Sequence, residues 1–177
     1  MGRIRTIMLV VVVMALMPLA PAAAHRKSHV DSNESPSRLD LRKAVVSHNR
    51  SVLKFKISTW ESWQPSELRR DRWFSVWIKT ARNDEYVVGI HYRRGRLRAP
   101  ISLPGETSKR VGTAAVKKVS PRAFLLKVPR SLISARSGFR WMGMSQWTSG
   151  SGACSPSCLD YMPGGTGFSG MFRRHQI

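Results

Sequence analysis

Acidic side chains are scarce in this sequence, and so are the residue combinations that most catalytic and metal sites require. The chain of 177 residues has 10 Asp and Glu against 30 Lys and Arg, with two Cys and five His. The motifs Gly-x-Ser-x-Gly and His-Glu-x-x-His are absent, and no Cys and His lie together as a nucleophile and its base. We therefore expect a protein that is not an enzyme and that binds no metal and no cofactor.

Only one long apolar run is present, and it lies at the N-terminus. Residues 7–19 are almost wholly apolar, follow two arginines, and precede residues 22–24, whose small side chains suit the subsites of signal peptidase. A retained membrane anchor is the alternative, because residues 7–24 approach the length of a membrane span, but two prolines weigh against it. We expect residues 1–24 to be a signal peptide and the protein to be secreted, with a surplus of 18 positive charges in the mature chain.

Sustained helical periodicity is missing from residue 25 onward, which argues against the α/β classes. Instead, Leu53, Phe55 and Ile57 alternate with polar residues, and a period of two is typical of a strand with one buried face. Runs of this kind, separated by turn signals, cover residues 39–46, 52–60, 73–80, 85–92, 96–103, 111–119, 123–128 and 139–147. We predict an all-β fold, an antiparallel β-sandwich of about eight strands with a short helical turn over residues 64–68.

Changes in composition indicate the domain limits. Residues 25–38 are polar and without an apolar period, so we expect a flexible leader there, followed by the β-sandwich domain over residues 39–163. Residues 164–177 contain several glycines and two adjacent arginines and are expected to be a flexible basic tail. The inward positions that we expect to be buried are Phe55, Ile57, Phe74, Val76, Ile78, Val88, Leu126 and Val128.

The two cysteines, Cys154 and Cys158, are close together in a segment that contains Ser and Pro. An exported chain meets an oxidising compartment, no nearby His completes a zinc site, and the spacer is longer than that of thioredoxin-like redox pairs. We therefore expect a disulfide bond between them. The bond closes a small loop and contributes about 2 kcal/mol to stability.

Several short motifs resemble those of a secreted β-sandwich domain found in actinobacterial exported proteins. They are Leu39-Asp40-Leu41-Arg42, Trp60, residues 73–78 followed by an acidic hairpin and Tyr86, Val128-Pro129, and Cys154-x-x-x-Cys158-x-Asp160. Domains of this kind are similar in layout to DOMON domains and to family-nine carbohydrate-binding modules. The resemblance covers about residues 39–163 and implies a jelly-roll-like sandwich used for binding, without assigning a ligand.

Aromatic and polar side chains share one face of the strand predicted over residues 73–80. That face reads Trp73, Ser75, Trp77 and Lys79. The two indole rings stand about 13 Å apart along a strand, which suits stacking on an oligosaccharide. We therefore single out Trp73, Trp77 and Lys79 as ligand-binding residues. The alternative is that residues 61–71 cover this face and that the rings belong to the core.

Basic residues cluster at predicted turns, most densely at Arg94, Arg96 and Arg98, which we also assign to ligand binding. Such clusters attract polyanions in a salt-sensitive way. We expect the partner of this protein, a monomer, to be a glycan or an anionic cell-envelope polymer, with peripheral contact to anionic membrane surfaces. Nucleic acid is not an expected partner, because the chain is exported. The alternatives are a structural envelope protein retained at the cell surface by its positive charge and a charged surface that only confers solubility.

A few carboxylates lie near predicted strand ends, where a Ca²⁺ ion could bridge loops through oxygen ligands. They are Asp31, Glu34, Asp40, Asp84, Glu85 and Asp160. No EF-hand loop is present, and the large positive charge of the chain disfavours a cation. We expect Asp40 to pair instead with Arg42 or with a neighbouring loop.

The mature protein is expected to begin at His25, because small residues occupy the signal-peptidase subsites immediately before it. Intact-mass spectrometry of the protein from culture supernatant measures this directly. A mass that still includes Met1 would contradict the assignment.

Overall fold

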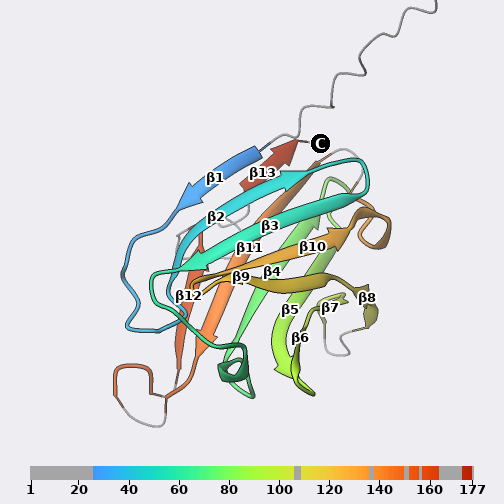
Figure 1. The fold of residues 1–177 in the computed structure, drawn as a ribbon. Coiled ribbons are helices and arrows are strands. Elements are labelled where there is room, and N and C mark those ends of the chain that lie inside the picture. The colour runs from blue at the N-terminus through green and yellow to red at the C-terminus, as the bar shows by residue number, and fades with distance from the viewer. Residues whose placement is uncertain are drawn as a thin grey trace, which may run out of the picture.

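The computed structural model describes residues 26–105, 109–135, 138–149, 152–155 and 157–163, together with the backbone of residues 173–176. The expected signal peptide lies outside the described residues. Antiparallel strands form two sheets that pack face to face, as Figure 1 shows, and the predicted all-β sandwich is confirmed. No helix in this part of the chain has the length and the apolar run needed to cross a bilayer.

The two sheets contain five and eight strands. The five-stranded sheet has the order β1 (Arg26–Val30), β2 (Leu41–His48), β3 (Val52–Thr59), β10 (Ala123–Pro129) and β9 (Ala115–Ser120). The eight-stranded sheet has the path β12 (Cys158–Met162), β11 (Gly138–Trp147), β4 (Trp73–Thr80), β5 (Glu85–Arg93), β7 (Pro100–Ser102) and β8 (Arg110–Thr113), with β13 (Arg173–Gln176) beside β11 and β6 (Arg96–Arg98) beside β5. Two short 3₁₀ turns are η1 (Pro65–Glu67) and η2 (Arg130–Leu132). The expected disulfide is confirmed, because Cys154 and Cys158 are bonded.

Alternating side chains let the two sheets share one core. In β3, Leu53, Phe55 and Ile57 are buried, while Lys54 and Lys56 between them face outward. All eight core residues predicted from the period of two are buried, which confirms the inward faces of β3, β4, β5 and β10. Burying one large apolar side chain contributes about 1.5–3 kcal/mol, so this interior supplies the main driving force for folding.

Two strands predicted as continuous are each broken at a buried alanine. Residues 96–103 form β6 and β7 on either side of Ala99, and residues 111–119 form β8 and β9 on either side of Ala114. The Ala114 N–H donates to the Ala99 carbonyl oxygen at 2.8 Å, so the two breaks lie side by side. Because β8 belongs to the eight-stranded sheet and β9 to the five-stranded sheet, the chain changes sheets at Ala114.

Two further strands lie in segments that the sequence marks as a leader and a tail. In the expected leader, Arg26–Val30 forms β1 and pairs along its whole length with β2. In the expected tail, Arg173–Gln176 forms β13 and pairs with β11. Backbone N–H and C=O groups make these pairings and require no apolar period in the side chains.

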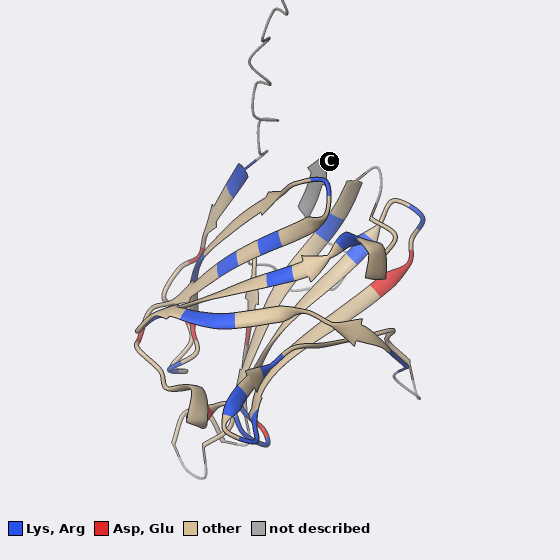
Figure 2. Ribbon diagram, turned by 45° about the vertical axis from the view of Figure 1, so that its right-hand side comes forward, with Lys and Arg blue, Asp and Glu red and all other residues tan. Residues whose placement is uncertain are grey.

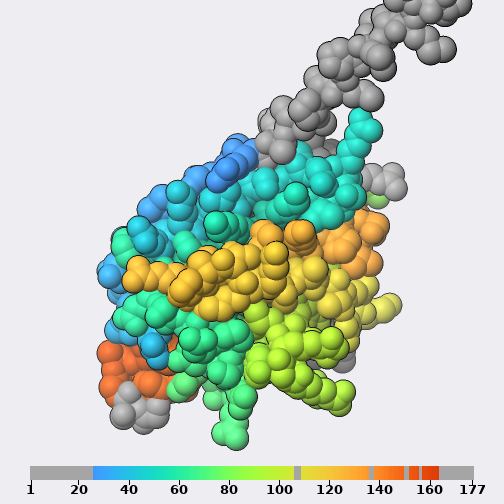
Figure 3. Space-filling view, in the orientation of Figure 1, coloured from blue at the N-terminus to red at the C-terminus, as the bar shows by residue number. Residues whose placement is uncertain are grey.

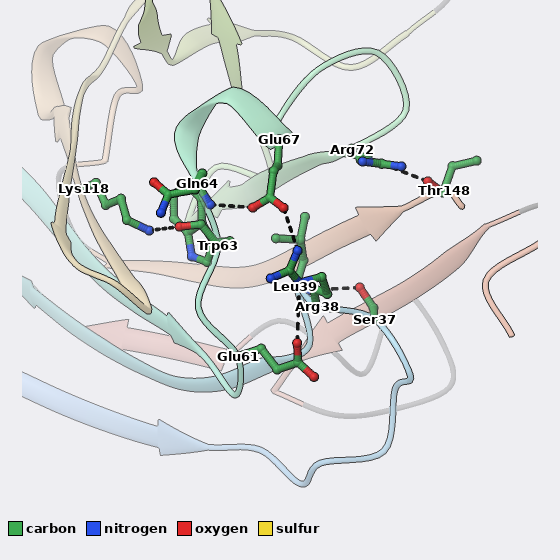
Figure 4. Close-up of polar contacts among 10 residues, drawn as sticks. All are labelled: Ser37, Arg38, Leu39, Glu61, Trp63, Gln64, Glu67, Arg72, Lys118 and Thr148. Atoms are coloured by element: carbon green, nitrogen blue, oxygen red, sulfur yellow. Dashed lines mark hydrogen bonds and ion pairs between the residues drawn. The ribbon is translucent and has the colours of Figure 1, made fainter. Parts of the chain in front are cut away.

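Residues 60–72, which we call the end segment, close one end of the sandwich (Figure 1). Trp63 is buried there, and its ring centroid lies 5.3 Å from that of Phe74 and 6.3 Å from that of Phe124. Figure 4 shows Lys118 reaching the Trp63 carbonyl oxygen, and the Lys118 ammonium also lies 3.8 Å from the centre of the Trp63 ring. These contacts fix the end segment against both sheets.

Polar contacts complete the attachment of the end segment. Arg38 lies 2.8 Å from a Glu67 carboxylate oxygen and 3.6 Å from one of Glu61, as Figure 4 shows. The Tyr92 N–H donates to the Leu68 carbonyl oxygen at 2.6 Å, which joins the segment to β5. The ion pairs are solvent-exposed and contribute only about 0.2–1 kcal/mol each, so the buried Trp63 and the backbone bond do most of the positioning.

Val76→Asp is expected to prevent folding, because Val76 is buried in β4 opposite Val88, where a carboxylate has no partner. The expected loss is about 4 kcal/mol or more, a large part of the stability of a domain of this size. Lys127→Asp is the matched control, since it places the same side chain on the outer face of β10, opposite Lys54. Circular dichroism melts measure both variants, and a wild-type melt for Val76→Asp would contradict the assigned core.

Candidate functional site

Two hollows meet at the end of β5, on the same end of the sandwich as the end segment. Their volumes are about 670 and 700 Å³, and both are lined by Tyr92 and Gly95. The first lies between the end segment and β5, and the second lies between the β5–β6 hairpin and β9. We call the two hollows together the Tyr92 groove.

The β5–β6 turn explains how several arginines come to one place. Arg94 and Gly95 link the strands, and both have a positive φ, 52° and 79°, which is the pattern of a type I′ turn. Glycine adopts this conformation without steric penalty, whereas an Arg does not. The register places Arg93 directly opposite Arg96. Like charges at such a position are destabilising by about 0.2–1 kcal/mol, so the hairpin is not arranged for maximal stability.

The positive charge of this hairpin is not neutralised by acidic neighbours. None of the ion pairs found among the described residues involves one of its arginines. Partial burial, together with the positive charges of Arg96 and Arg94, lowers the pKa of Arg98, which still stays protonated at neutral pH. Figure 2 shows the blue of Lys and Arg gathered at this lower end of the molecule. An anion in the groove would relieve the repulsion.

Aromatic rings lie among these charges. The Arg69 guanidinium carbon lies 5.2 Å from the centre of the Tyr92 ring, and Trp73 is half-buried in the same hollow. His91 lines this hollow too, and burial, followed by the charge of Arg93, lowers its pKa. A neutral imidazole at pH 7 both donates and accepts a hydrogen bond. The groove therefore offers guanidinium groups, aromatic rings on which a ligand can stack, and one neutral imidazole.

The structure brings together four of the six ligand-binding residues singled out from the sequence. Trp73 and Arg94 line the first hollow, and Arg96 and Arg98 line the second. The expected alternative, that the end segment covers Trp73, holds in part, because Leu68 and its neighbours form the opposite wall of the hollow.

Trp77 and Lys79 lie outside the groove. Lys79 pairs with Glu85 at 2.6 Å and lines a separate hollow of about 450 Å³. The Trp77 Nε1–H donates to Ser75 Oγ at 3.1 Å, and Met142, directly opposite Trp77 on β11, is buried. The outer face of β4 is therefore partly covered at Trp77. Trp73 and Trp77 do not form the continuous two-ring platform expected from the strand pattern.

Other residues that line the groove were not assigned to ligand binding from the sequence, among them Arg69, His91 and Tyr92. Tyr92 had a local signal, because it directly precedes the basic run that begins at Arg93. Arg69 lies in the basic run Arg69-Arg70-Asp71-Arg72, but its position over the Tyr92 ring depends on how the end segment folds back onto β5.

A second cationic surface is the outer face of the five-stranded sheet, which we call the lysine face. Lys54 and Lys127 stand directly opposite each other on it, and β1, β2, β3, β9 and β10 contain no Asp or Glu. Figure 3 shows the teal of β3 and the gold of β9 and β10 as the near surface. The face is formed by Lys43, Lys54, Lys56, Lys117 and Lys127.

A scan against protein-family models gave no match for this chain, and neither did searches of curated proteins and of solved structures. The resemblance to DOMON domains and to family-nine carbohydrate-binding modules stays a prediction from sequence motifs. Function is therefore inferred from the chemistry of the residues themselves.

Trp77→Ala is expected to lower the free energy of unfolding by about 3 kcal/mol, because the indole is half-buried and hydrogen-bonded to the buried Ser75. Trp73→Ala, at the border of the groove, is expected to lower it by only about half as much. Urea denaturation of the two variants measures the difference. Equal, small losses would mean that Trp77 is as open to a ligand as Trp73.

Proposed function

We propose that this protein is a secreted, non-enzymatic binding module for anionic polymers, which are glycans or cell-envelope polymers, and that the ligand lies along the Tyr92 groove. The observation that carries the proposal is the unneutralised arginine hairpin beside the rings of Tyr92 and Trp73. Stability alone favours an acidic residue opposite Arg93, where the chain has Arg96.

Each group in the groove has a role in this proposal. The guanidinium groups of Arg94, Arg96 and Arg98 bind carboxylate, sulfate or phosphate groups through paired N–H donors. The faces of Tyr92 and Trp73 stack against sugar rings or other flat apolar surfaces of the polymer.

The expected affinity for one repeat unit is low. Exposed charge pairs contribute about 0.2–1 kcal/mol each, and a ring contact contributes about 1 kcal/mol. A single disaccharide that makes three such contacts therefore binds weakly. A polymer that spans both hollows binds more tightly, because its later contacts are intramolecular.

The alternative is a structural envelope protein that its charge retains at the cell surface. The lysine face supports this alternative, because it is cationic and carries no aromatic ring that could select a sugar. If charge alone retains the protein, salt is expected to release it from any anionic polymer. Binding in the groove predicts that the residues of the groove matter more than an equal number of charges elsewhere.

The double variant Arg94→Asn, Arg96→Ser is expected to weaken binding of dextran sulfate about tenfold at physiological salt, because two guanidinium groups leave the groove. Asn is chosen because it tolerates the positive φ of position 94. Lys54→Ser, Lys127→Ser removes the same charge from the lysine face and is expected to weaken binding less than twofold.

Titrations with dextran sulfate, polyglutamate and uncharged dextran at two salt concentrations measure these effects. Stronger binding of dextran sulfate than of polyglutamate at matched charge indicates a glycan ligand. Equal losses in the two double variants would reject the groove in favour of retention by charge.

A further inference from the structure

Three carboxyl groups meet where the start of β2 approaches β12. Asp31, Asp40 and Asp160 are buried, with exposed fractions of 9%, 1% and 5%. The carboxyls of Asp40 and Asp160 are within hydrogen-bond reach of each other, and Asp31 interacts electrostatically with both. The Leu41 N–H donates to Asp160 Oδ2 at 2.5 Å. Both carboxylate oxygens of Asp40 and Oδ2 of Asp31 are buried, and no donor reaches them in full hydrogen-bond geometry. The backbone of Ser35 lies close enough to Asp40 to offset part of the rise in its pKa.

No basic side chain neutralises these groups among the described residues. The ion pairs found there involve other acids. Of the two partners expected for Asp40, Arg42 makes no ion pair with it, and its guanidinium lies 4.9 Å from the centre of the Trp60 ring. The neighbouring loop contributes only the backbone of Ser35. Burial raises the pKa of Asp40 to about 7 and that of Asp31 to about 6, and the charge of Asp160 adds to both shifts. Buried carboxylates without a partner are costly, so the cluster requires protons or a cation.

We propose that Asp31, Asp40 and Asp160 bind a divalent cation, and that this cation is Ca²⁺. Carboxylate oxygens are the ligands that hard cations prefer, and the nearby Cys158 is not a thiolate ligand, since it is in the disulfide. Ca²⁺ accepts a flexible set of six to eight oxygens, whereas Mg²⁺ demands near-ideal octahedral geometry. The fourth nearby carboxylate, Glu34, interacts electrostatically with Asp31 and Asp160.

A hollow on the same side borders one of the three proposed ligands. A cavity of about 240 Å³ is lined by Glu34, Ser35 and Asp160, among others, so it reaches the cluster at Asp160. Main-chain carbonyls and water supply the remaining ligands of Ca²⁺ in comparable sites. As the chain stands, no three carboxylate, imidazole or thiol groups of the described residues already enclose a metal. The ion therefore has to draw the side chains together, and we expect a Kd of about 0.1–1 mM, as in extracellular calcium modules.

The large positive charge of the chain does not exclude this site. Charges separated by more than about 8 Å through solvent are largely screened at physiological ionic strength. The local environment of the ion is set by the carboxylates of Asp31, Asp40, Asp160 and Glu34.

A bound ion would join the two sheets. Asp31 directly follows β1 and Asp40 directly precedes β2, both in the five-stranded sheet. Asp160 lies in β12, the edge of the path through the eight-stranded sheet, two residues after the disulfide-bonded Cys158. Binding is therefore expected to stabilise the folded protein against heat.

The test is a thermal melt of the purified, oxidised full chain, freed of metal with a chelator and then titrated with CaCl₂ to 10 mM. With the expected Kd, the unfolding equilibrium constant falls about 10- to 100-fold, which raises the Tm by about 3–10 °C. MgCl₂ at the same concentration is expected to raise it much less, and NaCl at matched ionic strength not at all. Calorimetric titration with CaCl₂ is expected to show one site per chain.

Asp160→Asn keeps an oxygen that can accept the Leu41 N–H and removes one ligand charge, so it is expected to abolish the rise in Tm with CaCl₂. Asp84→Asn makes the same change at an exposed position and is expected to keep the full rise. Asp40→Asn serves as the second variant if Asp160→Asn does not fold. An unchanged wild-type Tm in CaCl₂, or an equal rise in wild type and Asp160→Asn, overturns the proposal. In that case the carboxyl groups of the cluster are neutralised by shared protons and not by a cation.

Discussion

The contact between Phe74 of the eight-stranded sheet and Phe124 of the five-stranded sheet is the interaction on which the rest of the structure depends. Their ring centroids are 4.9 Å apart, and Trp63 packs edge-on against both rings. This trio fixes the distance between the sheets and at the same time anchors the end segment. Because the end segment is anchored, the Leu68 carbonyl accepts the Tyr92 N–H, and the wall of the Tyr92 groove stands opposite β5. A surface site therefore depends on the packing of three buried rings.

The arrangement of the surface charges, unlike that of the core side chains, does not maximise stability. Lys54 stands opposite Lys127, and Arg93 stands opposite Arg96, although an acidic residue at either place would make a favourable cross-strand pair. A fold driven by an apolar interior tolerates two penalties of this size, because each is small compared with the burial of one large side chain. Repulsion of this kind is relieved by an anionic partner, which is why we infer function from the placement of charge rather than from its total.

The sequence predicts the architecture well because side-chain alternation is a local property of each strand. Phe74, Val76 and Ile78 are identified as core residues without knowledge of any other strand. The edge strand β1 has no such signal, because backbone hydrogen bonds alone attach it to β2. The site is predicted only where its residues are local. The arginines of one hairpin are found from the sequence, whereas the surroundings of Trp77 depend on β11, which is distant in the sequence and places the buried Met142 opposite it. The carboxylate cluster joins residues 31 and 160, a contact that no local pattern encodes.

Burying acids also shapes the electrostatic field of the protein. Asp31, Asp40 and Asp160 are three of the 10 acidic residues, and inside the fold they do not neutralise surface arginines. Whether protons or a cation occupy the cluster, its net negative charge is reduced, so the exterior is more cationic than the composition alone indicates. The cluster and the Tyr92 groove share no lining residue, and exposed charges are screened beyond about 8 Å. In the proposed scheme the cation acts on the stability of the sandwich and the groove binds the polymer, so we expect each to change without the other.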